Sequence, residues 1–382
     1  MVKQCSGTAE RDPNDFSGQL DDAAWSPFQK FILGLISLAY LTDGVANQSL
    51  GLAIPALTQN WALPREAFAS VAAVGLLGLT LGAFVGGVLG DKLGRRRLMI
   101  ASTALFGGMT LAQAWASDVQ DLLVLRFLDG LGIGAMIPNG AALISEFTPR
   151  RERALALAIG MTCIAVGGMV AGILGNLLLE LHGWEGLFIV LGGIGVGVAT
   201  LLLFLLPESP AFLSNSPADQ ARLHRLARRC GITLDPAPAG AMLPARPREQ
   251  KKGTVSELFA KGVGSSTIFL WTAFFFCMLA NYTMFSWVPS MLAGLGFALS
   301  ATSLGMTALA FGGVVGGIAS GWLIKRFGSQ RAVLGLAAGG ALTTFALGVS
   351  LSVQAQGLAA VLTWLSVVGF FTAGLLNGLY TF

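Results

Sequence analysis

Charged residues are scarce in this chain. Asp, Glu, Lys and Arg make up 12% of its 382 residues, whereas about 25% is usual in soluble domains. Hydrophobic residues make up 54%, and the mean hydropathy is +0.70. This composition excludes a water-soluble enzyme and a secreted binding module, and it predicts an all-α integral membrane protein.

Side chains that commonly carry chemistry are few as well. Of the four cysteines, Cys5 and Cys230 are expected in the cytoplasm and Cys163 and Cys277 within the membrane, so no disulfide framework is implied. The sequence contains no nucleophile motif, phosphate-binding loop or metal-ligand cluster. We therefore expect neither an enzyme nor a bound metal or organic cofactor.

Ten apolar segments are long enough to cross a bilayer, since a membrane helix needs about 20 mostly apolar residues. They cover residues 28–57, 66–89, 98–116, 121–145, 153–180, 184–206, 265–290, 300–324, 331–352 and 357–381. The polar, proline-containing stretch 207–262 is expected to be a linker. Within it, residues 218–230 form either a basic amphipathic helix at the membrane surface or a solvated linker helix.

Positive charge is distributed unevenly along the chain. The chain has 24 Lys and Arg residues. If the N-terminus is cytoplasmic, all of them except Arg65 and Arg126 fall in the N-terminal tail, at the cytoplasmic end of the first span, or in cytoplasmic loops. The positive-inside rule therefore predicts a multi-pass protein of the bacterial inner membrane with its N-terminus in the cytoplasm. The net charge of +4 then reflects topology and gives no reason to expect a nucleic-acid partner.

The two halves of the chain are related by an internal repeat. When they are aligned, IPAL (54–57) falls on VPSM (288–291), and GDKLGRRR (90–97) falls on IKRFGSQR (324–331). Both copies start at a cytoplasmic end and pass through the same order of helices. They are therefore predicted to be parallel repeats, related by an axis along the membrane normal.

This repeat divides the chain into four predicted parts. They are a cytoplasmic tail (1–27), a six-helix half (28–206), a cytoplasmic linker (207–262) and a second half of four helices (263–382). Phe382 aligns with Thr148, so the second repeat is expected to be truncated, and helices eleven and twelve are expected to be missing.

The segment GDKLGRRR (90–97) resembles the loop 2–3 signature of the major facilitator superfamily. Further stretches resemble the aromatic acid:proton symporter branch of that superfamily: DGVANQSLG (43–51), RFLDGLGIGAMIPN (126–139), PESPAFL (207–213), YTMFSWVPSML (282–292) and GFFTAGLLNGLY (369–380). The resemblance implies two bundles that alternately expose a central site. It also implies proton-coupled uptake of a small aromatic carboxylate, such as a hydroxybenzoate, by a monomer in the lipid bilayer.

One departure from the branch leaves the coupling open. Ala46 stands where the branch has a second acid.

The alternatives to proton-coupled uptake are a proton-driven exporter of drugs or metabolites and an inactive, truncated transporter. The exporter is disfavoured, because antiporters of the superfamily carry a Gly-Pro pattern in helix five, and no proline lies between Pro149 and Pro207.

The loop 2–3 motif predicts a cytoplasmic gate. We expect Asp91 to cap a helix N-terminus, and Arg95 and Arg97 to pair with carboxylates at neighbouring helix ends. Glu146, at the cytoplasmic end of the fourth span, is expected to join this network. Anchoring by positive charge alone is the simpler alternative, but it does not explain the glycines or the acid.

Asp43 is a carboxylate near the middle of the first span. A charge at that depth is costly unless it is solvated, paired or protonated, so by default it marks a pathway or a proton relay. The resemblance implies that Asp43 carries the driving proton and that Asp43, Asn47 and Gln48 contact substrate. The alternative is a charge that is neutralised within a structural helix contact.

Arg126 is the one cation expected within a span, and two partners are in reach. It pairs either with Asp43 or with Asp129, one turn along its own helix. A guanidinium also fits a carboxylate substrate, whereas a pair with Asp129 that only fixes the helix is the structural alternative. Tyr282 and Trp287 are the aromatic candidates for contact with the substrate ring.

Overall fold

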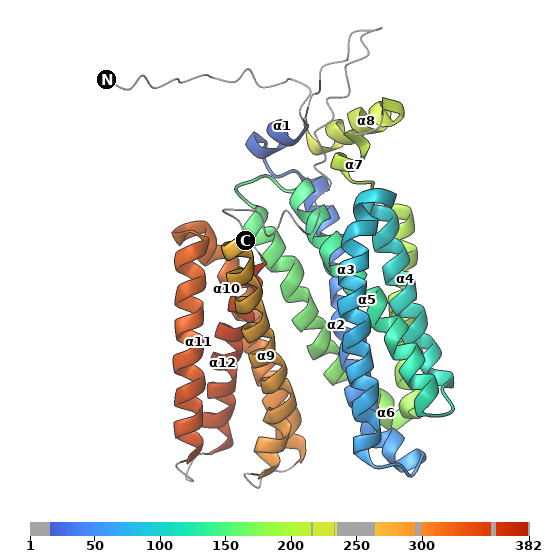
Figure 1. Ribbon diagram of the computed structural model, residues 1–382, viewed down its shortest axis with the longest axis vertical. Helices are drawn as coiled ribbons and strands as arrows, with labels where there is room; N and C mark the ends of the chain where they lie inside the picture. Colours follow the sequence, from blue (N-terminus) through green and yellow to red (C-terminus); the bar gives the residue numbers. More distant parts are fainter. Residues whose placement is uncertain are drawn as a thin grey trace.

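The computed structural model describes residues 16–214, 217–232, 234, 264–294, 299–352 and 357–380, and the regular structure in these ranges is helical (Figure 1). The long helices are α2 (Pro27–Asn60), α3 (Ala69–Leu93), α4 (Arg95–Ala112), α5 (Val119–Phe147), α6 (Arg153–Leu205), α9 (Gly264–Gly294), α10 (Leu299–Phe327), α11 (Ser329–Ser352) and α12 (Leu358–Leu379). The short ones are α1 (Phe16–Asp22), α7 (Pro210–Ser214), α8 (Gln220–Cys230), and the 3-10 helices η1 (Arg65–Phe68), η2 (Gln113–Trp115) and η3 (Pro217–Asp219).

The predicted all-α membrane fold is confirmed. Within the described ranges, nine helical segments are long and apolar enough to cross a membrane. They match every predicted span except the first, which lies in the 34-residue helix α2 and contains the polar residues around Asp43. The element α6 contains both the fifth and the sixth span, and the two helices are separated by non-helical backbone at Gly183 (φ 69°, ψ −169°), where the positive φ suits glycine.

Helix α2 begins at a strong local signal. The Ser26 hydroxyl accepts a hydrogen bond from the Gln29 backbone N–H (3.3 Å), and the Gln29 side chain accepts one from the Ser26 N–H (2.7 Å). Pro27 occupies the first turn, where no intrahelical donor is lost. This capping box sets where the helix that carries Asp43 starts.

Glycines allow the helices of each half to approach closely. Gly78, Gly82 and Gly86 are buried along α3, and a Cβ atom at Gly82 would collide with the carbonyl of Leu131 on α5. In the second half, a Cβ atom at Gly316 of α10 would collide in the same way with a carbonyl of α12. The corresponding helix pairs of the two halves therefore pack through matching glycines, as parallel repeats should.

Helices α2 to α6 form one bundle and α9 to α12 the other (Figure 1). The bundles meet where α6 packs against α10. Lys325 donates to Glu152 at 2.6 Å, and the Asn377 amide donates to the Thr162 hydroxyl at 3.1 Å. Figure 1 shows α1, α7 and α8 together at one end of the molecule, which we call the predicted cytoplasmic end.

Residues 220–230 of the predicted linker form the helix α8, as the sequence indicates. Its apolar residues Leu223, Leu226, Ala227 and Cys230 are buried against the core of the first bundle. Its arginines face outward. The helix is therefore docked on the bundle through one face, which neither of the two sequence-based alternatives specifies.

Candidate functional site

Asp43 lies at the middle of α2 and is 1% exposed. Its neighbour Gly44 explains the burial, since a Cβ atom there would collide with the Ile164 carbonyl of α6. One carboxylate oxygen of Asp43, Oδ1, has no hydrogen-bond partner among the described residues. An ionised carboxylate without partners is costly in an apolar interior, whereas a protonated carboxyl is neutral. The geometry therefore fits a proton-binding group.

Arg126 projects from α5 toward α2 and pairs with Asp129. Its Nη1 donates to Asp129 Oδ2 at 2.6 Å and to the Ala46 carbonyl at 3.3 Å, and its Nη2 donates to the Asn47 carbonyl at 3.0 Å. Asp129 also accepts a bond of 3.1 Å from the Thr110 hydroxyl. The structure thus favours the second of the two partners that the sequence left open.

Asp43, Arg126 and Asp129 nevertheless form one electrostatic cluster, which we call the buried triad. Asp43 interacts electrostatically with both other members, although it bonds neither. Arg126 is 7% exposed and Asp129 is fully buried. Two acids therefore share one cation in a site from which bulk water is excluded.

The remaining predicted substrate contacts are placed less closely. Asn47 is exposed, and Gln48 is half-buried on the side of α2 that faces Gly168 of α6. Tyr282 and Trp287 belong to α9, but their side chains lie outside the described residues. The structure therefore brings Asp43 and Arg126 together and says nothing of the aromatic pair.

Three of the predicted gate residues, Asp91, Arg95 and Glu146, meet at the predicted cytoplasmic end. Arg95 bonds Glu146 at 2.8 Å and Asp91 at 3.2 Å, and the Ser209 hydroxyl donates to Glu146. For Arg97, which is exposed, no ion pair is formed with any described residue. The expected role of Arg95 in a charge network is thus matched by geometry, but that of Arg97 is not.

The expected cap by Asp91 is wrong. Asp91 lies in the last turn of α3, with its side chain 67% exposed. The start of α4 is instead capped by Glu208, which accepts a bond of 3.1 Å from the Arg96 backbone N–H. A carboxylate from a segment more than a hundred residues away is a tertiary contact that the local pattern of loop 2–3 does not reveal.

Two further residues of this region, Arg96 and Ser209, were not predicted from the sequence. The Arg96 side chain donates to the Leu206 carbonyl at 2.5 Å and to the Leu203 carbonyl at 2.6 Å, so it ties loop 2–3 to the end of α6. Ser209 joins Glu146 to the same segment. The stretch PESPAFL was the available signal, because its acid and serine are the two polar groups that reach this network.

Comparisons with known proteins identify the family of this chain. The model of the Major Facilitator Superfamily matches residues 36–382. A 4-hydroxybenzoate transporter of Pseudomonas aeruginosa is 32% identical over 312 residues, which cover 81% of this chain and 69% of that protein. A gallate transporter of Pseudomonas putida is 32% identical over 364 residues, which cover 95% and 78%.

Solved structures show the same fold. The proton:xylose symporter XylE superposes with a TM-score of 0.78 at 19% identity, over 94% of this chain and 82% of XylE. At this level of identity, the likeness concerns the arrangement of helices and not the bound molecule.

Proposed function

Because this chain belongs to the major facilitator superfamily and to its aromatic acid transporters, we propose that it takes up small aromatic carboxylates together with protons, by alternating access. It is a multi-pass membrane transporter and not an enzyme. Its relatives are named for 4-hydroxybenzoate, gallate, benzoate and 3-(3-hydroxy-phenyl)propionate. These compounds share one aromatic ring and one carboxylate, which is the substrate class we assign.

The observation that carries the proton coupling is the unpartnered carboxyl of Asp43 beside the Arg126–Asp129 pair. With Asp43 protonated, Arg126 is free to hold Asp129 and two carbonyls of α2. Once Asp43 loses its proton, it competes with Asp129 for the guanidinium. The protonation state of Asp43 thereby controls how α2 is tied to α5.

Charge balance suggests one proton for each cycle. The buried triad carries a net charge of −1 when all three groups are ionised, and it becomes neutral when one proton binds. A neutral cluster is strongly preferred in a buried, membrane-spanning site. Asp129 is therefore the second acid of the buried triad, whereas Ala46 still stands where the branch has a second acid in the first span.

A carboxylate substrate introduces a further negative charge into the site. Its uptake is favoured when the triad has first become neutral, because Arg126 is then not opposed by two ionised acids. Asn47 and Gln48, one turn beyond Asp43, offer amide donors for a carboxylate or a ring hydroxyl. Binding of the proton before the substrate follows from this order of charges.

The gate network is proposed to close the cytoplasmic side. The contacts Arg95–Glu146 and Lys325–Glu152 lie at the same end of the molecule. The first locks loop 2–3 within one bundle, and the second joins the two bundles. We also propose the inner membrane and a cytoplasmic N-terminus, on the basis of the uneven distribution of positive charge, and a monomer, on the basis of the family resemblance.

The test separates coupling from binding. Asp43→Asn keeps the size of the side chain but binds no proton, so concentrative uptake of 4-hydroxybenzoate should be lost, whereas exchange of internal for external substrate should persist. Glu66→Gln, which removes an exposed acid outside the buried triad, is the control for a general effect of altered charge and should keep wild-type uptake. Concentrative uptake by Asp43→Asn at the wild-type level would remove Asp43 from the mechanism.

A further inference from the structure

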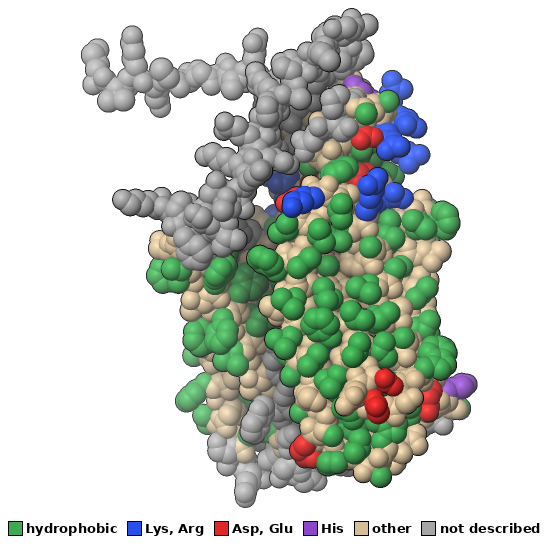
Figure 2. Space-filling view, turned by 45° about the vertical axis from the view of Figure 1, so that its right-hand side comes forward, with side chains coloured by type: hydrophobic (Ala, Val, Ile, Leu, Met, Phe, Trp, Pro, Cys, Tyr) green, Lys and Arg blue, Asp and Glu red, His purple; other side chains and the backbone are tan. Residues whose placement is uncertain are grey.

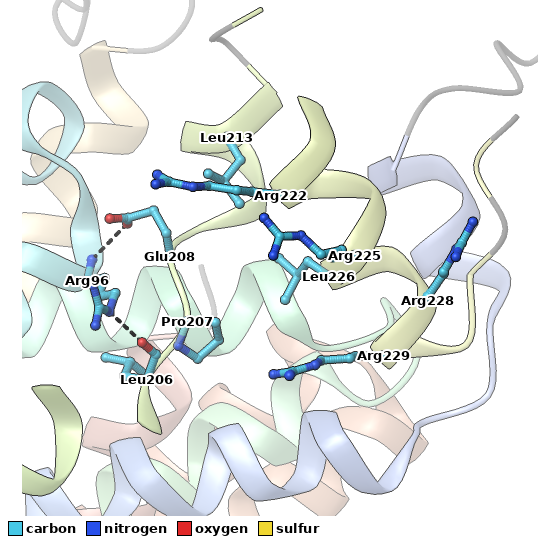
Figure 3. Close-up of a pocket in the computed structure, with 10 residues that line it drawn as sticks. All are labelled: Arg96, Leu206, Pro207, Glu208, Leu213, Arg222, Arg225, Leu226, Arg228 and Arg229. Atoms are coloured by element: carbon cyan, nitrogen blue, oxygen red, sulfur yellow. Dashed lines mark hydrogen bonds between the residues drawn. The ribbon is translucent and has the colours of Figure 1, made fainter. Parts of the chain in front are cut away.

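A second charged site lies apart from the buried triad. It is an open pocket of about 530 Å³ at the predicted cytoplasmic end, between α8 and the segment that follows α6 (Figure 3). Its charged lining consists of five arginines and one acid: Arg96, Arg222, Arg225, Arg228, Arg229 and Glu208. The rest of the lining is apolar. A pocket with this excess of positive charge calls for an anionic ligand.

The sequence of α8 explains why the arginines gather. Since its apolar face is buried against the core, the basic residues are forced to the other side of the helix. Arg222, Arg225 and Arg229 follow one another at intervals of three and four residues, which places them on one face. Figure 3 shows these three on the side of the pocket, whereas Arg228 points away.

The protein itself neutralises only part of this charge. Glu208 already caps α4 through the Arg96 N–H, and Arg222 is paired with Asp219 at 3.0 Å. Arg225 bonds only a carbonyl of its own helix, that of Ala221, among the described residues. At least the outer nitrogens of Arg225 are therefore available to an external anion.

The pocket also borders the surface that faces lipid. The last turn of α6 exposes Leu203, Phe204 and Leu205, and Phe204 is 78% exposed. These residues directly precede Leu206, which lines the pocket. In Figure 2, the basic side chains gather above a surface of largely hydrophobic side chains. The arginines thus lie where the apolar surface ends, at the height expected of lipid headgroups.

We propose that this arginine pocket binds the phosphate of an anionic phospholipid in the adjoining leaflet, with the acyl chains along the exposed end of α6. The planar guanidinium fork matches phosphate oxygens, which accept two parallel hydrogen bonds. An apolar neighbour distinguishes a lipid from a free phosphate ester, because only the lipid gains from contact with Leu203, Phe204 and Leu205.

The experiment compares lipid binding to the purified full chain by native mass spectrometry. The protein in detergent receives equal amounts of phosphatidylglycerol and phosphatidylcholine, and the ratio of the two bound lipids is measured. Wild type should prefer phosphatidylglycerol. Arg222→Gln/Arg225→Gln should lower this preference by about fivefold for each arginine removed, about 25-fold in total. Arg225→Gln alone serves if the double variant does not remain folded.

Two control variants keep the test specific. Arg150→Gln/Arg331→Gln removes two exposed arginines at the same end but outside the pocket, and it should keep the wild-type preference. Arg222→Lys/Arg225→Lys keeps the charge and should lose less than the glutamine variant. Equal losses in the two glutamine double variants, or no loss in either, would overturn the proposal.

A soluble phosphate ester tests whether the ligand of the pocket is a phospholipid or a free phosphate ester. Glycerol phosphate, which has the headgroup chemistry without the chains, should fail to displace phosphatidylglycerol at equal concentration. Displacement by glycerol phosphate, together with its own binding to wild type but not to Arg222→Gln/Arg225→Gln, would overturn the assignment to lipid in favour of a soluble phosphate ester.

Discussion

The substitution Arg126→Lys tests the buried triad through its hydrogen bonds. Lysine keeps the charge and can still form an ion pair with Asp129. It cannot at the same time reach the carbonyls of Ala46 and Asn47, which Arg126 bonds at 3.3 and 3.0 Å. Hydrogen bonds from charged donors contribute about 1.5–3 kcal/mol in proteins and interhelical bonds in membranes average about 0.6 kcal/mol, so we take about 1 kcal/mol for each of the two. The free energy of unfolding should therefore fall by about 2 kcal/mol.

The assay is equilibrium unfolding in mixed micelles, followed by circular dichroism as the denaturing detergent is increased. Arg126→Gln leaves Asp129 buried without its cation and should cost about 3–5 kcal/mol. The double variant Arg126→Gln/Asp129→Asn removes the charge from both partners and should recover about half of that loss. Arg126→Lys as stable as wild type, or a double variant no more stable than Arg126→Gln, would refute the described network.

Three further predictions concern other parts of the molecule. Glu146→Gln breaks the ion pair with Arg95 (2.8 Å), so the initial rate of uptake should fall by about tenfold at equal protein in the membrane; an unchanged rate would contradict the gate. Gly82→Val should abolish recovery of monodisperse protein and Gly87→Val should not, because only the first Cβ meets the facing helix; similar yields would contradict the packing. Burial raises the pKa of the Cys230 thiol to about 11, so in a variant without the other cysteines the rate of maleimide labelling should rise about ninefold between pH 9 and pH 10, as the thiolate fraction grows. A rise of less than about twofold, which an ordinary thiol would show, would contradict this burial.

Membrane helices were the most predictable part of the structure. Long apolar runs determine them locally, since backbone groups in a bilayer must be satisfied within the helix. The repeat was visible for a related reason, because Gly82 and Gly316 serve the same close contact in the two halves. The boundary between the fifth and sixth spans, predicted between residues 180 and 184, falls at Gly183, where non-helical backbone (φ 69°, ψ −169°) interrupts α6.

The site was predictable in its members and less so in their pairing. Asp43 and Arg126 stand out as charges in apolar helices, yet the sequence leaves open whether Asp43 or Asp129 pairs with Arg126. The choice is set by packing, since the close approach at Gly44 fixes α2 against α6 while Thr110 and Arg126 converge on Asp129. Contacts between segments far apart in the chain left no comparable local pattern, as the cap by Glu208 shows.

Proton-coupled uptake is the central claim, and one measurement addresses it directly. The initial uptake of labelled 4-hydroxybenzoate into cells that express this chain is compared with and without a protonophore, after the protein has been confirmed in the membrane. The account predicts rapid uptake that collapses when the protonophore dissipates the gradient. Uptake that proceeds to the same level without the gradient would contradict it.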